Sequence, residues 1–325
     1  MSPRLRLVGA LIALALAAAA CSSDEPPADG GGSPGADATG GGAAYVAQVA
    51  SSDLYVGAPQ RVAVGMFANS AEGLRLVTSG EVEVAISPFE GGEGTPTEGT
   101  ARYVPAPGTE VADDGPTLTD AADGRGVYEL ADVTFDASGV WQASVTFTVD
   151  GEGPYTVAAT PFEVAEDPAY PAPGDRALRT RNLTMSSDAP PEAIDSRAVG
   201  GGKIPDPELH RTTIADAIRR GRPVLAIFST PTYCESLFCG PVTDAIEALA
   251  AEHDDAAVFI HVEIWREHPS VLNEGAAEWL YRDDDLTEPW LFLIGADGRV
   301  VDRWGPLFDV EEVAGMLADL PDTAR

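Results

Sequence analysis

The stretch PVLAIFSTPTYCESLFCGPV, residues 223–242, decides the fold expected for the second half of this chain. Its first six residues form an unbroken apolar run, the pattern of a strand that is buried on both faces of a parallel sheet. Two cysteines follow, Cys234 and Cys239. A helix is expected over 241–253, because Val242 and Ile246 then share one face. This order of strand, cysteine loop and helix predicts an α/β domain.

The segments on either side of this stretch continue the alternation of strands and helices. The predicted elements are a helix at 212–220, a strand at 257–264, a helix at 273–281, strands at 290–294 and 299–304, and a helix at 310–320. The last two strands are joined by the turn Ala296-Asp297-Gly298. One sheet with helices on both faces is therefore expected.

Four features of residues 209–320 together resemble the thioredoxin superfamily. They are the strand 223–228, the box Phe238-Cys239-Gly240-Pro241-Val242, the Thr287-Glu288-Pro289-Trp290 stretch, and Asp297-Gly298-Arg299-Val300 with the later Gly305. The resemblance implies a thioredoxin-like fold without a cofactor, and a cis-proline at Pro289 that opens the strand 290–294. It also implies disulfide exchange with an exported protein thiol or disulfide, with the backbone beside Pro289 presented to an extended substrate segment.

The cysteine spacing departs from the family pattern. Val242 stands where the family has its second cysteine, and Cys234 lies upstream instead. If the sequence is aligned from the end of the strand at Phe228, Cys234 falls at the family's nucleophile position. If the Cys-Gly-Pro motif is aligned instead, Cys239 falls there. We expect Cys239 at the helix start and Cys234 folded back over it, because residues five apart on one helix point about 140° apart. A loop can bring the two Cα atoms to the roughly 5.5–6 Å that a disulfide needs.

The resemblance and this arrangement together imply distinct roles for the two thiols. Cys239 would attack, activated by the helix dipole, and Cys234 would resolve the mixed disulfide. Gly240 and Pro241 would open the helix, with the proline at the first helical position. The lone pair of cysteines, if exported, is also typical of a disulfide bond.

Other residues of this region restrain the expected reactivity and keep alternatives open. Glu235 and Glu288 would disfavour a thiolate beside them, and Ile227 stands where the family has a buried acid. One alternative is a non-catalytic surface binding module whose disulfide is structural, worth about 2 kcal/mol. Another is a copper or zinc site, for which His268 is a weak candidate ligand. His261 is expected in the core or on a face of the sheet, and no metal ligand is assigned.

Residues 43–165 alternate with period two instead. Val82, Val84 and Ile86 alternate with polar or small residues, and turn-forming residues separate such runs. The segment contains no cysteine or histidine. We expect an immunoglobulin-like antiparallel β-sandwich. Three aromatic residues are candidates for a binding face but are expected in the core: Tyr103, Tyr128 and Trp141.

The N-terminus indicates export. Arg4 and Arg6 precede an apolar run over 7–20, and Cys21 follows three alanines, which resembles the lipobox of bacterial lipoproteins. Ala18 stands where that family prefers leucine. An ordinary cleaved signal peptide with an incidental Cys21 is the alternative. We expect a lipid anchor on the outer face of a bacterial membrane.

The sequence divides into two predicted domains, a signal peptide and two linkers. It comprises a signal peptide at 1–21, a flexible linker at 22–42, a sandwich at 43–165, a Pro- and Gly-rich linker at 166–208 and a thioredoxin-like domain at 209–325. The net charge of −32 argues against nucleic acid as a partner, because so acidic a surface repels phosphate backbones.

Overall fold

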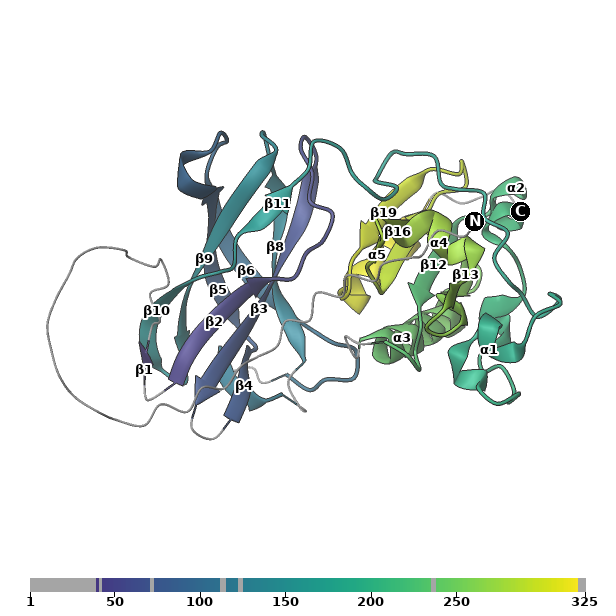
Figure 1. Cartoon of the computed structure of the whole chain (residues 1–325), viewed down its shortest axis with the longest axis horizontal. Coiled ribbons are helices and arrows are strands. Elements are labelled where there is room, and N and C mark those ends of the chain that lie inside the picture. Colours follow the sequence, from purple (N-terminus) through teal and green to yellow (C-terminus); the bar gives the residue numbers. More distant parts are fainter. Residues whose placement is uncertain are drawn as a thin grey trace, which may run out of the picture. The chain divides into compact units, whose positions relative to one another are not determined.

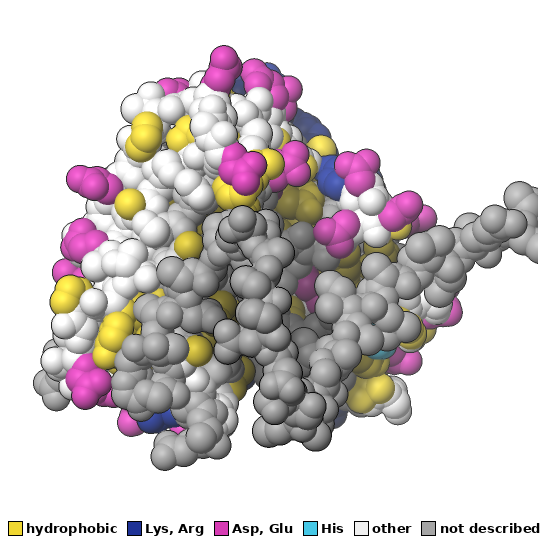
Figure 2. All heavy atoms as spheres, turned by 60° about the vertical axis from the view of Figure 1, so that its left-hand side comes forward, with side chains coloured by type: hydrophobic (Ala, Val, Ile, Leu, Met, Phe, Trp, Pro, Cys, Tyr) yellow, Lys and Arg dark blue, Asp and Glu magenta, His cyan; other side chains and the backbone are white. Residues whose placement is uncertain are grey.

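A computed structural model describes residues 39–40, 43–70, 73–111, 115–121, 125–234 and 238–320. The expected signal peptide, Cys21, most of the first linker and Glu235 lie outside the described residues. No helix among the described residues is long and apolar enough to cross a membrane. On the face shown in Figure 2, Asp and Glu side chains are scattered widely with few basic side chains between them, as the net charge leads one to expect.

The N-terminal region is built from antiparallel strands, consistent with the expected β-sandwich (Figure 1). The strands are β1 (Thr39–Gly40), β2 (Ala43–Val49), β3 (Pro59–Ser70), β4 (Gly73–Thr78), β5 (Glu81–Pro88), β6 (Thr97–Pro105), β7 (Thr117–Asp120), β8 (Gly126–Thr134), β9 (Gly139–Val149), β10 (Glu152–Ala158) and β11 (Phe162–Val164). Their main order is β1-β2-β3-β8-β6-β5-β9-β10, with β4 and β7 paired beside β3 and β11 paired with β9.

The period-two pattern explains which side chains fill this region. Along β5, Val82, Val84 and Ile86 are buried, and the residues that alternate with them are exposed. A turn at Asp150 and Gly151, both with positive φ, links β9 to β10, which suits the twist of a tight hairpin. The aromatic candidates for a binding face belong to the interior, as expected: Tyr128 and Trp141 are buried and Tyr103 packs against the same core.

The C-terminal region forms a second, four-stranded sheet in the order β13-β12-β18-β19. Its strands are β12 (Val224–Ser229), β13 (Val258–Glu263), β18 (Trp290–Ile294) and β19 (Val300–Trp304). The central strand β12 pairs parallel with β13 and antiparallel with β18. Every residue of β12 is buried, as the unbroken apolar run over 223–228 predicts.

Helices pack against both faces of this sheet (Figure 1). They are α2 (Ile214–Arg219), α3 (Cys239–Glu252), α4 (Glu274–Leu280) and α5 (Val310–Ala318). Leu225 and Ile227 face the side of α3 and α5, whereas Ala226 and Phe228 face the side of α2 and α4. All the helices and strands predicted here are present, with bounds that agree to within two residues. Two short hairpins were not expected: β14 (Trp265–Glu267) with β15 (Val271–Leu272), and β16 (Tyr281–Arg282) with β17 (Asp285–Leu286).

Residues 166–208, expected as a linker, are largely irregular but are packed against the second region. They contain α1 (Pro191–Ile194) and two short 3₁₀ turns, η2 (Ser196–Ala198) and the start of η3 (Pro207–His210). Ala193 and Ile194 are buried, and the Asn273 side chain donates a hydrogen bond to the Ala193 carbonyl at 2.8 Å. The Pro and Gly content correctly indicates little regular structure, but the segment is more than a spacer.

Candidate functional site

Cys234 and Cys239 form a disulfide bond, with a Cα–Cα separation of 5.9 Å. Cys239 is the first residue of α3, and Cys234 lies in the turn after β12, where its N–H donates to the Thr230 carbonyl. The pairing and the position of each cysteine therefore match the expectation from sequence. Pro241 differs slightly: it is the third residue of α3 rather than the first. It is tolerated there because N–H groups of the first turn have no partner within the helix.

The two sulfur-bearing residues are in different environments. Cys239 is fully buried, whereas Cys234 is partly exposed. The Cys239 N–H, at the start of α3, donates to the Cys234 sulfur at 3.3 Å. The positive end of the helix backbone therefore points at the sulfur of Cys234, the residue for which the sequence predicts the resolving role.

Glu288 lies beside the disulfide, and Pro289 follows it in the chain. A carboxylate oxygen of Glu288 and the two sulfurs all lie within 4.8 Å of one another. The Glu288–Pro289 peptide bond is cis, as expected, and β18 begins at the next residue. The loop that enters β18 thus places a carboxyl group next to the sulfur pair.

The weak metal candidate, His268, is close to the cysteine loop but is otherwise engaged. Its ring stacks on Tyr233 with 4.1 Å between ring centroids and meets Trp265 edge-on. In the described part of the chain, the side chain that joins both sulfurs at metal-ligand spacing is Glu288, not His268.

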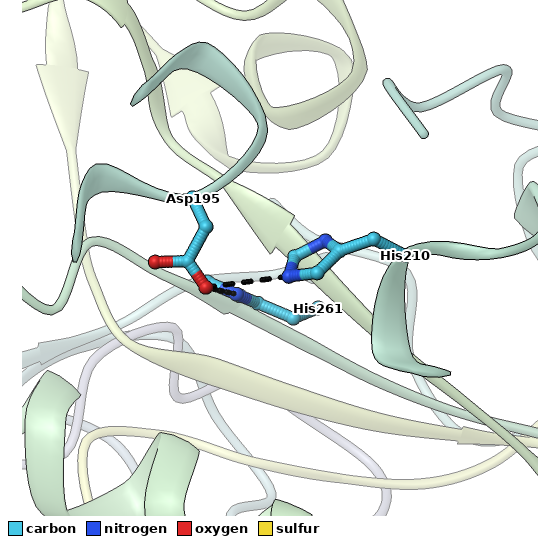
Figure 3. A group of neighbouring side chains, drawn as sticks. All are labelled: Asp195, His210 and His261. Atoms are coloured by element: carbon cyan, nitrogen blue, oxygen red, sulfur yellow. Dashed lines mark hydrogen bonds and ion pairs between the residues drawn. The ribbon is translucent and has the colours of Figure 1, made fainter. Parts of the chain in front are cut away.

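A second polar cluster, which the sequence did not reveal, lies within the same region. Asp195, His210 and His261 are all fully buried and converge on one another (Figure 3). One oxygen of Asp195, Oδ2, is 3.3 Å from His210 Nε2 and 3.4 Å from His261 Nδ1. Asp195 follows α1, His210 ends η3, and His261 is in the middle of β13, so no local motif joins them.

Arg197 holds the carboxylate of Asp195. The Arg197 backbone N–H and Nε donate to Oδ1 at 2.9 and 3.1 Å, and Nη2 donates to Oδ2 at 2.8 Å. Burial alone would raise the pKa of Asp195, but its interactions with His210, His261 and Arg197 outweigh burial and hold that pKa well below its usual range. Burial lowers the pKa of His210, which its hydrogen bond to Asp195 only partly offsets.

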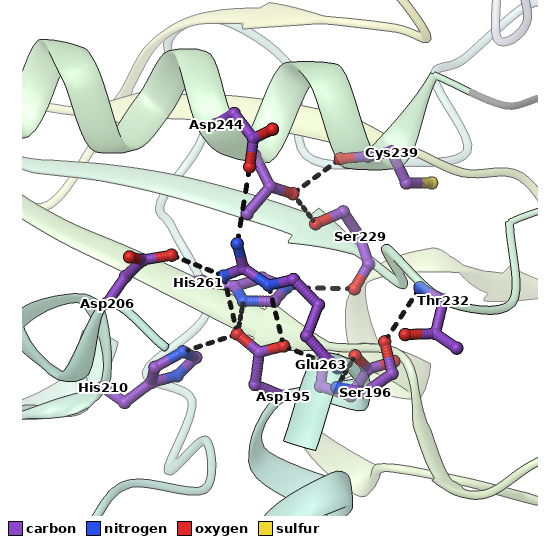
Figure 4. Close-up of polar contacts among 12 residues, drawn as sticks. Asp195, Ser196, Asp206, His210, Ser229, Thr232, Cys239, Asp244, His261 and Glu263 are labelled. Carbon is purple, nitrogen blue, oxygen red and sulfur yellow. Dashed lines mark hydrogen bonds and ion pairs between the residues drawn. The ribbon is translucent and has the colours of Figure 1, made fainter. Parts of the chain in front are cut away.

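Hydrogen bonds connect this cluster to the helix that carries Cys239 (Figure 4). The Ser229 carbonyl lies 3.2 Å from His261 Nε2, and the Ser229 hydroxyl is 2.7 Å from that of Thr243. Thr243 in turn donates to the Cys239 carbonyl at 2.7 Å. The chain passes through carbonyl groups, which carry no proton to transfer, so it positions the end of β12 against α3 rather than conducting protons.

A comparison of the sequence with known protein families finds no match, and a comparison with curated proteins finds none either.

Proposed function

We propose that this protein is an exported thiol–disulfide oxidoreductase of thioredoxin-like type, with the Cys234–Cys239 pair as its reactive group. One observation carries the proposal. The disulfide joins a turn to the start of a helix: Cys234 is partly exposed and its sulfur receives a helix N–H, whereas Cys239 is fully buried. An accessible sulfur at a helix N-terminus is the setting in which a thiolate is stabilised and reactive.

The geometry favours Cys234 as the attacking thiol, which reverses the roles expected from sequence. In the reduced protein, the Cys234 thiolate would attack one sulfur of a partner disulfide, and the partner's other sulfur would leave as a thiolate and take up a proton. Cys239, once deprotonated, would then attack the Cys234 sulfur and release the partner's second thiol. The partner gains two electrons, and the protein regains its disulfide.

The thioredoxin-like assignment is supported by the second region as a whole. Strand β12 is followed by the cysteine loop and α3, and the cis-proline Pro289 precedes β18 and follows Glu288, whose carboxylate lies near both sulfurs. In this assignment Pro289 and its neighbouring backbone would receive an extended substrate segment. For the first region we propose an immunoglobulin-like sandwich, supported by its antiparallel strands and its large apolar core.

The test of the proposed function is the reduction potential of the Cys234–Cys239 pair, measured by equilibration with glutathione. A potential between about −120 and −270 mV would support exchange with protein partners. A value below about −300 mV would mark a structural bond, and the protein would then be a non-catalytic binding module displayed outside the cell.

Glu288→Gln removes a charge next to the sulfurs while preserving the size of the side chain. A carboxylate within 4.8 Å disfavours a thiolate, so the variant should have a lower thiol pKa and a more positive reduction potential. The expected shift is tens of millivolts, since about 30 mV corresponds to 1.4 kcal/mol for two electrons. Glutathione equilibration of both proteins measures it. Glu274→Gln, an exposed acid at the start of α4, is the matched control and should leave the potential unchanged.

We also propose a lipid anchor at Cys21, supported by the apolar run before it and by a disulfide, which suits an oxidising compartment. Cys21→Ser should move the protein from the membrane fraction to the soluble exported fraction. Fractionation followed by N-terminal sequencing provides the measurement. A wild-type protein that is already soluble, with its mature N-terminus elsewhere, would rule the anchor out.

A further inference from the structure

The buried cluster of Asp195, His210 and His261 takes no part in the disulfide exchange proposed above. From its geometry we infer that the cluster binds one Zn²⁺ ion through Asp195 Oδ2, His210 Nε2 and His261 Nδ1. The inference is independent of the chemistry of the cysteines, because its ligand atoms belong to other residues and all three residues are fully buried.

The distances in the cluster suit an ion better than direct hydrogen bonds. The two imidazole nitrogens lie 3.3 and 3.4 Å from Asp195 Oδ2, beyond the usual range of about 2.7–3.2 Å for N–H···O bonds. Zinc bound to nitrogen and oxygen at about 2.0–2.1 Å in a tetrahedron holds its ligand atoms roughly 3.3–3.4 Å apart. All three ligand atoms lie within 4.8 Å of one another. Both distances from Asp195 Oδ2 therefore match the edges of a zinc tetrahedron, with the fourth position left to a small non-protein ligand.

The groups that face the two ring nitrogens of His261 also favour a cation beside Nδ1. Its Nε2 lies 3.2 Å from the Ser229 carbonyl, which can only accept, so this nitrogen carries the hydrogen. In a neutral imidazole the Nδ1 lone pair then faces the carboxylate of Asp195, and two acceptors repel each other. An ion between them removes this repulsion. A hydrogen bond from the outer ring nitrogen to a carbonyl is also the usual support of a zinc-bound histidine.

Arg197 does not fully neutralise the negative charge of the carboxylates at this site. Its guanidinium also pairs with Asp206 at 2.6 Å, so the two carboxylates and one guanidinium retain one negative charge to offset Zn²⁺. Two donors of Arg197 engage Asp195 Oδ1 and a third, Nη2, engages Oδ2 at 2.8 Å, which fixes the carboxylate with Oδ2 also facing both imidazoles. Such an ion would join the segment of α1 and η3 to the middle of β13.

The first test measures Zn²⁺ binding to the full-length protein carrying Cys21→Ser, Cys234→Ser and Cys239→Ser, which removes all three thiols as competing ligands. After treatment with a chelator and titration with Zn²⁺, we expect one ion per chain by elemental analysis and a higher melting temperature. Co²⁺ in place of Zn²⁺ should give the visible absorption of tetrahedral nitrogen and oxygen ligation. Absence of Zn²⁺ binding to this protein would overturn the inference, and a result here leaves the exchange activity of Cys234 and Cys239 untouched.

The second test assigns the ligands. In the same background, His261→Gln and Asp195→Asn should each weaken Zn²⁺ binding more than about a hundredfold, since even residues supporting a ligand contribute 10–100-fold. His253→Gln, at the far end of α3, is the control and should bind as before. Unchanged binding in both ligand variants would overturn the inference. So would ¹⁵N spectra showing both His261 ring nitrogens protonated in the presence of Zn²⁺, a measurement that requires no variant to fold.

Discussion

Cys239→Ser is expected to leave a thiol at Cys234 that is alkylated at least roughly tenfold faster near neutral pH than the Cys239 thiol left by Cys234→Ser. Two features act in the same direction. Cys234 is partly exposed and receives the backbone N–H of residue 239, whereas Cys239 is fully buried. A helix N-terminus stabilises a thiolate, and burial in apolar surroundings opposes it. The Cys239→Ser variant retains the backbone N–H of residue 239, so the substitution itself should not remove the effect.

Alkylation rates measured across pH on the two reduced single variants test this order. Both variants should react at the same rate when unfolded, which controls for intrinsic differences between the two sites. Faster alkylation in the Cys234→Ser variant would restore the order expected from sequence, with Cys239 as the attacking residue. It would show that the direction of one helix N–H does not decide which thiol is activated.

The sequence predicted the second region well because its signals are local. The run 224–229 is apolar at every position but the last, and the strand it forms is buried at every position. Helix α3 likewise places Val242, Ile246 and Leu249 in one apolar cluster, as their spacing predicts. Two cysteines five residues apart, the second of them at a helix start, also leave few arrangements, so the disulfide was predictable.

The parts that sequence did not predict depend on contacts between distant segments. Asp195, His210 and His261 come from a turn, a 3₁₀ helix and a strand, and nothing in their spacing joins them. The sequence also did not predict the environment of each cysteine, because that environment depends on contacts between the turn after β12 and the start of α3. Composition showed that residues 166–208 lack regular structure, but it could not show that Ile194 would be buried.

Trp279→Ala is expected to lower the free energy of unfolding by about 3–5 kcal/mol, the usual cost of removing a fully buried large aromatic side chain. Trp279 lies in α4 and is fully buried against the rings of Phe228 and Phe292, at centroid distances of 5.0 and 4.7 Å. The side chain thus fills the space between α4 and β12, the strand that leads to the cysteine loop. Urea unfolding followed by circular dichroism measures the change, and Val301→Ala, at an exposed position on β19, should cost little.

Trp279→Phe separates this packing from the attachment of residues 166–208. The indole Nε1 donates to the Thr180 hydroxyl at 2.6 Å, and Thr180 itself donates to Glu278, so the phenylalanine variant leaves Thr180 with a partner. Its cost should therefore be near that of one net hydrogen bond and a small loss of volume, about 1–2 kcal/mol. Equal costs for the two substitutions would mean that attachment of the 166–208 segment, rather than aromatic packing, gives Trp279 its role. If neither substitution changed stability, α4 would not pack against β12 through Trp279 as described. The cysteine loop would then be held in place by α3 alone.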